Sequence, residues 1–172
     1  MAEKGIINGY EEKNNVLFKP NQNITREEFI KIICSASYTE EIESIDTLPF
    51  ADWNDVSDWA KKYLYQAFKN EIVLGEKISE TEYNCNPKKN ITRAEAMVII
   101  SRLLDIEETI DNLEFLDENE IPQWAITEVK QLTSLKILNG YEDNTIRVTN
   151  NITRGETAVI IYRFLEVKEN TK

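Results

Sequence analysis

The chain has 172 residues, 41% of them hydrophobic, and a formal net charge of -11. This length allows one compact domain or a short array of repeats with a sizeable core. The negative charge argues against general binding to nucleic acid or to an anionic membrane, because both need a basic surface. The chain contains no histidine, which removes the commonest general base and the usual zinc ligand. We therefore expect neither an enzyme nor a bound metal or cofactor.

In chain order, the first predicted element is a glycine turn at Gly9, followed by a polar loop and a helix that opens with NITREE from Asn23. The same opening recurs as NITRAE from Asn90 and as NITRGE from Asn151. Apolar residues follow each opening at helical spacing. The sequence therefore predicts three helices of one kind.

A second kind of helix precedes two of these openings. The segments FADWNDVSDWA and FLDENEIPQWA align with each other, and an apolar run with helical spacing follows Trp59 and Trp124. Each run stops at a glycine, Gly75 or Gly140, where glycine suits a helix C-terminus. The two patterns together define a repeat of two helices.

We predict three repeats that together form one compact domain: an incomplete one over residues 1–40, which lacks its first helix, and complete ones over 50–106 and 115–167. Without that partner, the second helix of the first repeat, from Phe29 to Ala36, should expose an apolar face. We therefore expect either that the natural protein continues upstream of Met1 or that two chains form a dimer through this face.

Each helix opening carries a threonine with a glutamate three residues later, which is the pattern of a capping box. The threonines are Thr25, Thr92 and Thr153, and the glutamates are Glu28, Glu95 and Glu156. The same stretch spells the glycosylation signal N-x-T three times. A capping threonine beside a loop asparagine explains this pattern without an attached sugar.

Arginine follows each capping threonine, at Arg26, Arg93 and Arg154. A cation is unfavourable at the positive end of a helix, so each arginine should have an anion nearby. One alternative is an internal carboxylate such as Asp52 or Asp117. The other is an external anion, bound by the guanidinium beside exposed amide N–H groups at the helix start.

Aromatic residues allow two interpretations. Trp59 and Trp124 precede apolar residues at helical spacing, which favours partly buried core anchors, although an exposed edge could stack on a sugar. Tyr10 and Tyr141 directly follow a glycine turn and are candidates for the rim of a site.

The two cysteines are too few to indicate a redox compartment. Cys34 lies in an apolar helical run, which favours a buried thiol, whereas Cys85 lies in a polar loop. A disulfide between them stays open. No apolar run approaches the length of a membrane span, and the segment MAEKGIINGY has no signal-peptide core.

The combination of F-x-D, WA, GY, a polar loop and ITRAE at Ile91–Glu95 resembles the S-layer homology (SLH) domain family. The resemblance implies a mainly α fold, in which tandem two-helix repeats with short extended loop segments form a pseudo-three-fold assembly. It also implies a non-catalytic function outside the cell, at the cell wall or S-layer. SLH domains anchor surface proteins to secondary cell-wall polysaccharide that carries ketal-linked pyruvate, in grooves between repeats.

The resemblance also implies roles for particular residues. Arg26, Arg93 and Arg154 would face the pyruvate carboxylate, while Gly9, Gly75 and Gly140 would allow close backbone approach. The grooves for the sugar would be lined by Asp52, Trp59, Asp117 and Trp124. The first repeat lacks F-x-D and WA, the second has Glu76 in place of the tyrosine, and the third has ITRGE. We therefore expect one or two competent grooves.

The alternative function is a protein–protein interaction or surface-layer assembly module without glycan binding. A glycosidase is disfavoured, because no carboxylate pair has a spacing that specifies the two-acid geometry of that chemistry.

Overall fold

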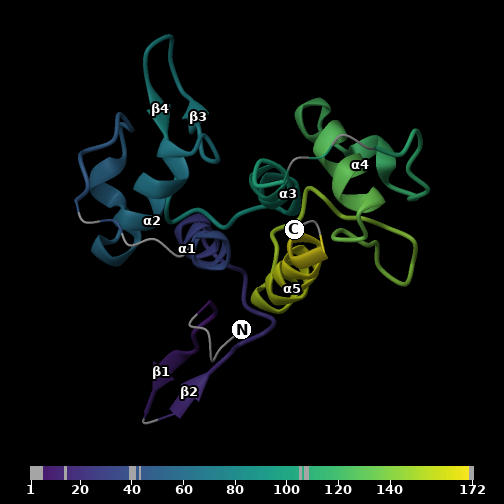
Figure 1. The fold of residues 1–172 in the computed structure, drawn as a ribbon, viewed down its shortest axis with the longest axis horizontal. Helices are drawn as coiled ribbons and strands as arrows, with labels where there is room; N and C mark the ends of the chain where they lie inside the picture. The colour runs from purple at the N-terminus through teal and green to yellow at the C-terminus, as the bar shows by residue number, and fades with distance from the viewer. Residues whose placement is uncertain are drawn as a thin grey trace. The chain divides into compact units, whose positions relative to one another are not determined.

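The computed structural model describes residues 6–13, 15–38, 42, 44–104, 106 and 109–170. The chain divides into two compact units, one formed by residues 1–8 and 24–90 and the other by 9–23 and 91–172. Among these described residues, the elements are mainly helices, with two short β-hairpins (Figure 1). The expected mainly α fold with short extended loop segments is therefore confirmed. The pseudo-three-fold packing of the repeats and their grouping into one domain stay predictions.

The first unit contains α1 (Arg26–Ser37), α2 (Asp58–Lys69) and a hairpin of β3 (Glu76–Lys77) and β4 (Tyr83–Asn84). Helix α1 packs against α2, which belongs to the second predicted repeat. Phe29 on α1 is fully buried. The expectation that α1 would expose an apolar face is therefore wrong, and this face gives no reason to expect a dimer.

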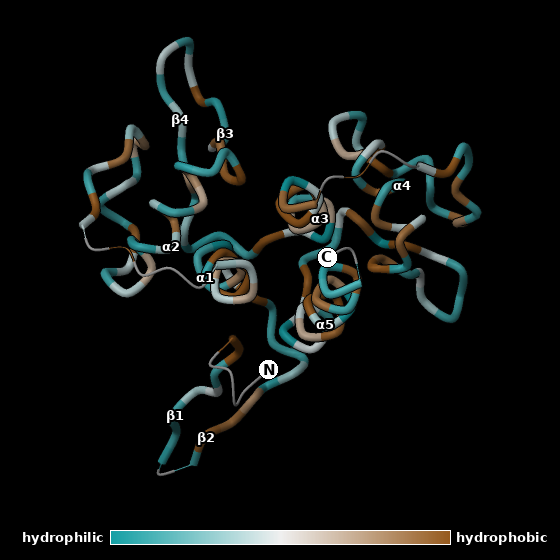
Figure 2. Tube along the Cα trace, viewed as in Figure 1, coloured by the Kyte–Doolittle hydropathy of each residue, from teal (hydrophilic) through white to brown (hydrophobic). Residues whose placement is uncertain are grey.

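The second unit begins with a hairpin of β1 (Tyr10–Glu12) and β2 (Asn15–Leu17). It continues with α3 (Arg93–Ser101), short 3-10 turns, α4 (Ile126–Ser134) and α5 (Arg154–Asn170). Helix α3 packs against α4. Apolar residues recur along α5 between hydrophilic ones (Figure 2), and Ile160, Ile161 and Phe164 are its buried members.

All three predicted capping boxes are present at the starts of α1, α3 and α5. The backbone N–H of Thr25, Thr92 and Thr153 donates to the glutamate three residues later at 2.9, 2.9 and 2.8 Å. Each glutamate N–H donates in return to the threonine hydroxyl. The glutamates therefore fix the helix starts, as the sequence predicted.

The next backbone N–H groups of these helices are also satisfied, by a loop from another repeat. Arg26 N donates to Lys89 O, Arg93 N to Asn150 O and Arg154 N to Gln22 O, each at 2.9 Å. Every one of these bonds lies inside one of the two units. The residue after each arginine makes a second such bond. The expectation of exposed amides at the helix starts is therefore wrong, since the loops take these donors.

Glycine does not cap the first helix of a repeat. Helices α2 and α4 end with Glu71 and Lys136 in the left-handed region, at φ 59° and φ 57°. Ile72 N then donates to Ala67 O at 2.8 Å, as expected for a Schellman motif. The glycines that were expected to form these C-termini lie further along the chain.

Both cysteines lie in the first unit as free, buried thiols, so no disulfide joins them. Burial raises the pKa of Cys34 to about 12. Burial, followed by a hydrogen bond to Asp52, raises the pKa of Cys85 as well. The buried thiol predicted at Cys34 is confirmed. The Cys85 side chain is also buried, although it lies in a polar loop.

Candidate ligand-binding site

Arg93, at the start of α3, is a buried cation held in one orientation. Only 4% of its surface is exposed. Its Nε donates to Ile146 O at 3.1 Å, and its Nη2 donates to Asn139 O at 3.4 Å. The guanidinium carbon lies 4.9 Å from the centre of the Tyr141 ring. These contacts place the positive charge without consuming every N–H of the guanidinium.

A cavity of about 290 Å³ opens beside Arg93 in the second unit. Its lining brings together residues from α3, from the loop after α4 and from α5, including Arg93, Tyr141, Gly155, Glu156, Val159 and Arg163. Two arginines and one glutamate therefore share a small open cavity. Such a set of groups suits a ligand with a negatively charged substituent.

Glu156 is the internal anion of this site. Its Oε1 lies 3.6 Å from Arg93 Nη1 and accepts the Tyr141 hydroxyl, while its Oε2 accepts the Thr153 N–H. Burial acts to raise the pKa of Glu156, but the hydrogen bonds from Tyr141 and Thr153 outweigh it and hold the pKa below its ordinary value. Glu156 therefore stays ionised and committed to these partners.

Arg154, at the start of α5, repeats the arrangement of Arg93. It is also 4% exposed. Its Nε donates to Phe18 O at 3.0 Å, and its Nη1 donates to the Tyr10 hydroxyl at 3.3 Å. The guanidinium carbon lies 4.4 Å from the centre of the Tyr10 ring. Tyr10 and Tyr141, the two candidate rim residues, thus lie against Arg154 and Arg93, respectively.

Arg26 differs, because the second repeat supplies Glu76 where the other repeats supply a tyrosine. Arg26 is half-buried at the start of α1. The Glu76 carboxylate accepts the Asn86 side-chain amide at 2.7 Å and lies 3.8 Å from Lys89 Nζ. A carboxylate therefore replaces the phenol ring at the sequence position that corresponds to Tyr141.

The two aspartates of the F-x-D segments hold loops in place. Asp117 accepts the backbone N–H of Ile146 at 2.7 Å and of Arg147 at 2.8 Å. Asp52 accepts the corresponding N–H groups of Cys85 and Asn86 at 2.8 and 2.7 Å. Arg93 does have an internal carboxylate beside it, as one alternative expected, but the residue is Glu156 and not an aspartate of these segments. The Nε of Arg93 instead contacts the loop that Asp117 anchors.

At each of the three predicted glycines, an added Cβ would come too close to other atoms of the protein. A Cβ on Gly140 would lie 2.4 Å from the Phe115 ring, and one on Gly9 would lie 2.4 Å from Val16. Gly75 has φ +85°, and its Cβ would lie 2.6 Å from the Phe50 ring. Close packing inside the repeats therefore explains these glycines. Gly140 also lines the cavity beside Arg93.

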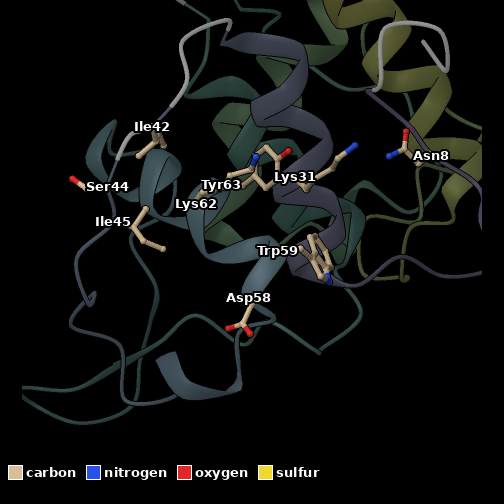
Figure 3. A pocket seen from close by; sticks show the side chains of 9 residues that line it. All are labelled: Asn8, Lys31, Ile42, Ser44, Ile45, Asp58, Trp59, Lys62 and Tyr63. Atoms are coloured by element: carbon tan, nitrogen blue, oxygen red, sulfur yellow. The ribbon is translucent and has the colours of Figure 1, made fainter.

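Trp59 and Trp124 are exposed to 49% and 56%, whereas Trp53 is only 7% exposed. The core-anchor interpretation is therefore wrong for Trp59 and Trp124, which are exposed, whereas Trp53 is buried. Trp59 borders a second cavity of about 630 Å³ in the first unit, together with Lys31 and Tyr63 (Figure 3). The structure places neither Trp59 nor Trp124 in the lining of the cavity beside Arg93.

Gly155 and Arg163 line this cavity but were not among the residues expected at the site. Glu156, Val159 and Arg163 are separated by three and then four residues, so they lie on one face of α5. This spacing was readable from the sequence. The loop that faces these residues across the cavity was not predictable from the sequence, because it comes from another part of the chain.

A sequence model of the S-layer homology domain matches residues 1–30 and 114–158. The chain is 29% identical to an amylopullulanase of Thermoanaerobacterium thermosulfurigenes over 99% of this chain and 9% of that protein. It is 37% identical to cell surface glycoprotein 1 of Acetivibrio thermocellus over 95% of this chain and 7% of that protein. A cellulosome-anchoring protein of the same species is 38% identical over 46% of this chain and 19% of that protein.

The chain belongs to the S-layer homology domain family, as the resemblance implied. Its division into three repeats stays a prediction. Family membership places it at the cell surface, as the resemblance implied. The chain spans less than a fifth of the length of these relatives. Likeness to so small a part of the amylopullulanase does not carry that protein's activity to this chain. Among the described residues, no helix is long and apolar enough to cross a membrane.

Proposed function

We propose that the chain is a non-catalytic anchoring module that binds cell-wall polysaccharide carrying ketal-linked pyruvate. The observation that carries the proposal is the buried Arg93 guanidinium, oriented by Ile146 and Tyr141 beside a small cavity. A ketal-linked pyruvate has one carboxylate on a compact ring. A preoriented arginine beside an open cavity suits such a group, because little side-chain entropy is lost on binding.

The proposal extends to Arg154, which has the same Nε-to-carbonyl bond and the same tyrosine contact. Arg26 is less suited, since Glu76 replaces the tyrosine and adds negative charge. Two competent sites are therefore proposed. Two weak sites that engage one polymer raise its avidity through effective concentration, so losing one should weaken binding disproportionately.

The test is pull-down of the purified chain with wall polysaccharide before and after chemical removal of pyruvate. Arg93→Gln is the informative variant, and Arg147→Gln is its matched control. Arg147 also stacks on Tyr141, at 4.3 Å, but does not line the cavity. Binding should require pyruvate, be lost in Arg93→Gln and persist in Arg147→Gln, with both variants folded by circular dichroism.

Equal binding of the pyruvylated and depyruvylated polymers would count against the proposed ligand. Binding of neither polymer would favour the alternative, a protein-interaction or surface-layer assembly module. Light scattering would then show association that rises with protein concentration.

A further inference from the structure

Arg163 is a second guanidinium in the cavity beside Arg93. It lies on α5 and lines the same cavity as Arg93 and Glu156. Among the described residues, no hydrogen bond or ion pair engages the Arg163 side chain. Arg93, in contrast, donates hydrogen bonds to two backbone carbonyl groups and lies beside Glu156.

Helix geometry directs Arg163 towards this site. Seven residues separate it from Glu156, which is about two turns or roughly 10 Å along the helix axis. Long side chains on a helix lean towards its N-terminus, so the Arg163 side chain extends back towards Glu156 and Arg93. Val159 lies between them on the same face and also lines the cavity.

The charged side chains that line the cavity include one more cation than anion. Glu156 offsets one arginine, and its oxygens already accept bonds from Thr153 and Tyr141. The second arginine therefore makes the cavity locally positive in a chain whose net charge is -11. A carboxylate that enters between the two guanidinium groups would complete the balance.

We propose that Arg163 is a specificity-determining residue that binds the ligand's carboxylate through its open guanidinium fork, with Arg93 as the second, preoriented contact. This inference rests on the proposed function. It assigns the bidentate contact to a residue on the middle of α5, outside the ITR opening. The matching positions, nine residues after Arg26 and Arg93, are Ser35 and Arg102, so the first repeat cannot supply this contact.

The first experiment compares Arg163→Gln, Arg163→Lys and the control Lys168→Gln for binding to pyruvylated wall polysaccharide by titration calorimetry. Lys168 lies on the same helix, and its replacement removes the same charge, but it does not line the cavity. Arg163→Gln should lose about tenfold or more in affinity, as for a lost hydrogen bond to a charged group. Arg163→Lys should also weaken binding, because an ammonium cannot form the fork. Equal affinities for Arg163→Gln and Lys168→Gln would overturn the inference.

A second experiment does not depend on the polysaccharide. The arginine Nε–Hε signals of the wild-type chain are followed by NMR while sodium acetate replaces sodium chloride at constant ionic strength. The Arg163 signal should shift and saturate with acetate. No saturable shift at Arg163 overturns the inference even when the wild-type chain binds pyruvylated polymer. If the wild-type chain does not bind the polymer, a saturable shift of the Arg163 signal supports the anion site and refutes the proposed function.

Discussion

The carboxylate of Glu27 lies 2.6 Å from the ammonium group of Lys88, and it joins α1 to the start of α2. The same carboxylate accepts the backbone N–H of Ser57 at 3.1 Å and its hydroxyl at 2.9 Å. Glu27 is 4% exposed. Aligning the repeats on their ITR and WA segments shows that all three residues change together, to Ala94, Pro122 and Thr149. The first unit therefore has an ionic link that the corresponding segments of the second unit lack.

Removing this link should destabilise the protein. Glu27→Ala is expected to lower the free energy of unfolding by about 2 kcal/mol, since it leaves the Ser57 donors and the Lys88 charge without their partner. Lys88→Thr should cost less, about 1 kcal/mol, because the lysine side chain is 55% exposed and solvent screens the pair. Urea unfolding of both single variants and the double variant measures the coupling. Additive effects would show that Glu27 and Lys88 do not interact in solution.

Lys89→Thr provides the control for this series. Lys89 lies beside Lys88, but its partner Glu76 is at 3.8 Å, and both side chains are more than half exposed. Its replacement should change stability by less than about 0.5 kcal/mol.

Gly75 should not tolerate alanine. Its φ of +85° disfavours a side chain, and the new Cβ would lie 2.6 Å from the Phe50 ring. We expect Gly75→Ala to cost roughly 2 kcal/mol or more in thermal or urea unfolding. Gly75→Asn separates the two causes, because asparagine accepts positive φ but keeps the clash. Recovery of stability in Gly75→Asn would mean that backbone strain alone accounts for the loss.

The Cys34 thiol should be unreactive in the folded chain. Its pKa of about 12 leaves almost no thiolate at pH 8, and only thiolate attacks a disulfide reagent. Ellman's reagent should therefore modify Cys34 slowly in buffer and rapidly in concentrated urea. Cys85→Ser isolates the signal of Cys34. Rapid reaction of that variant without urea would contradict the burial.

Glu156 should make stability depend on pH in the acid range. Its pKa in the folded chain lies below the ordinary 4.5, so its contribution is complete above that value. The contribution is lost as the pH falls below 4.5 through the folded pKa. Glu156→Gln should therefore lower the melting temperature at pH 7 and narrow its difference from wild type near pH 3. A constant difference across this range would show that the charge of Glu156 contributes nothing.

The helices were predictable because their signals are local. The capping pair Thr92 and Glu95 is three residues apart, and the apolar spacing that follows is visible in a short window. The site depends on distant partners, which a short window does not contain. Arg93 meets Asn139 and Ile146 only after a loop from the third repeat folds onto α3. The sequence therefore predicted the arginine but not what holds it.

The glycines and tryptophans show the same limit. A glycine after an apolar run indicates a chain reversal, yet only the folded chain reveals that the Phe115 ring excludes a side chain at Gly140. Trp59 and Trp124 have the spacing of core residues, but burial depends on what packs against a helix face. After each of these tryptophans it is the next residue, Ala60 or Ala125, that is fully buried.

The bond from Arg154 Nε to Phe18 O joins residues 136 positions apart in the chain. A ribosome makes Phe18 early and Arg154 near the end of this segment. The β1–β2 hairpin therefore lacks its contact with α5 until almost the whole segment has been synthesised. Helices α1 and α2 can pack against each other sooner. Two short strands are marginally stable alone, so this hairpin should be among the last elements to become protected from solvent. Truncation before α5 would leave this hairpin as the first target for a protease.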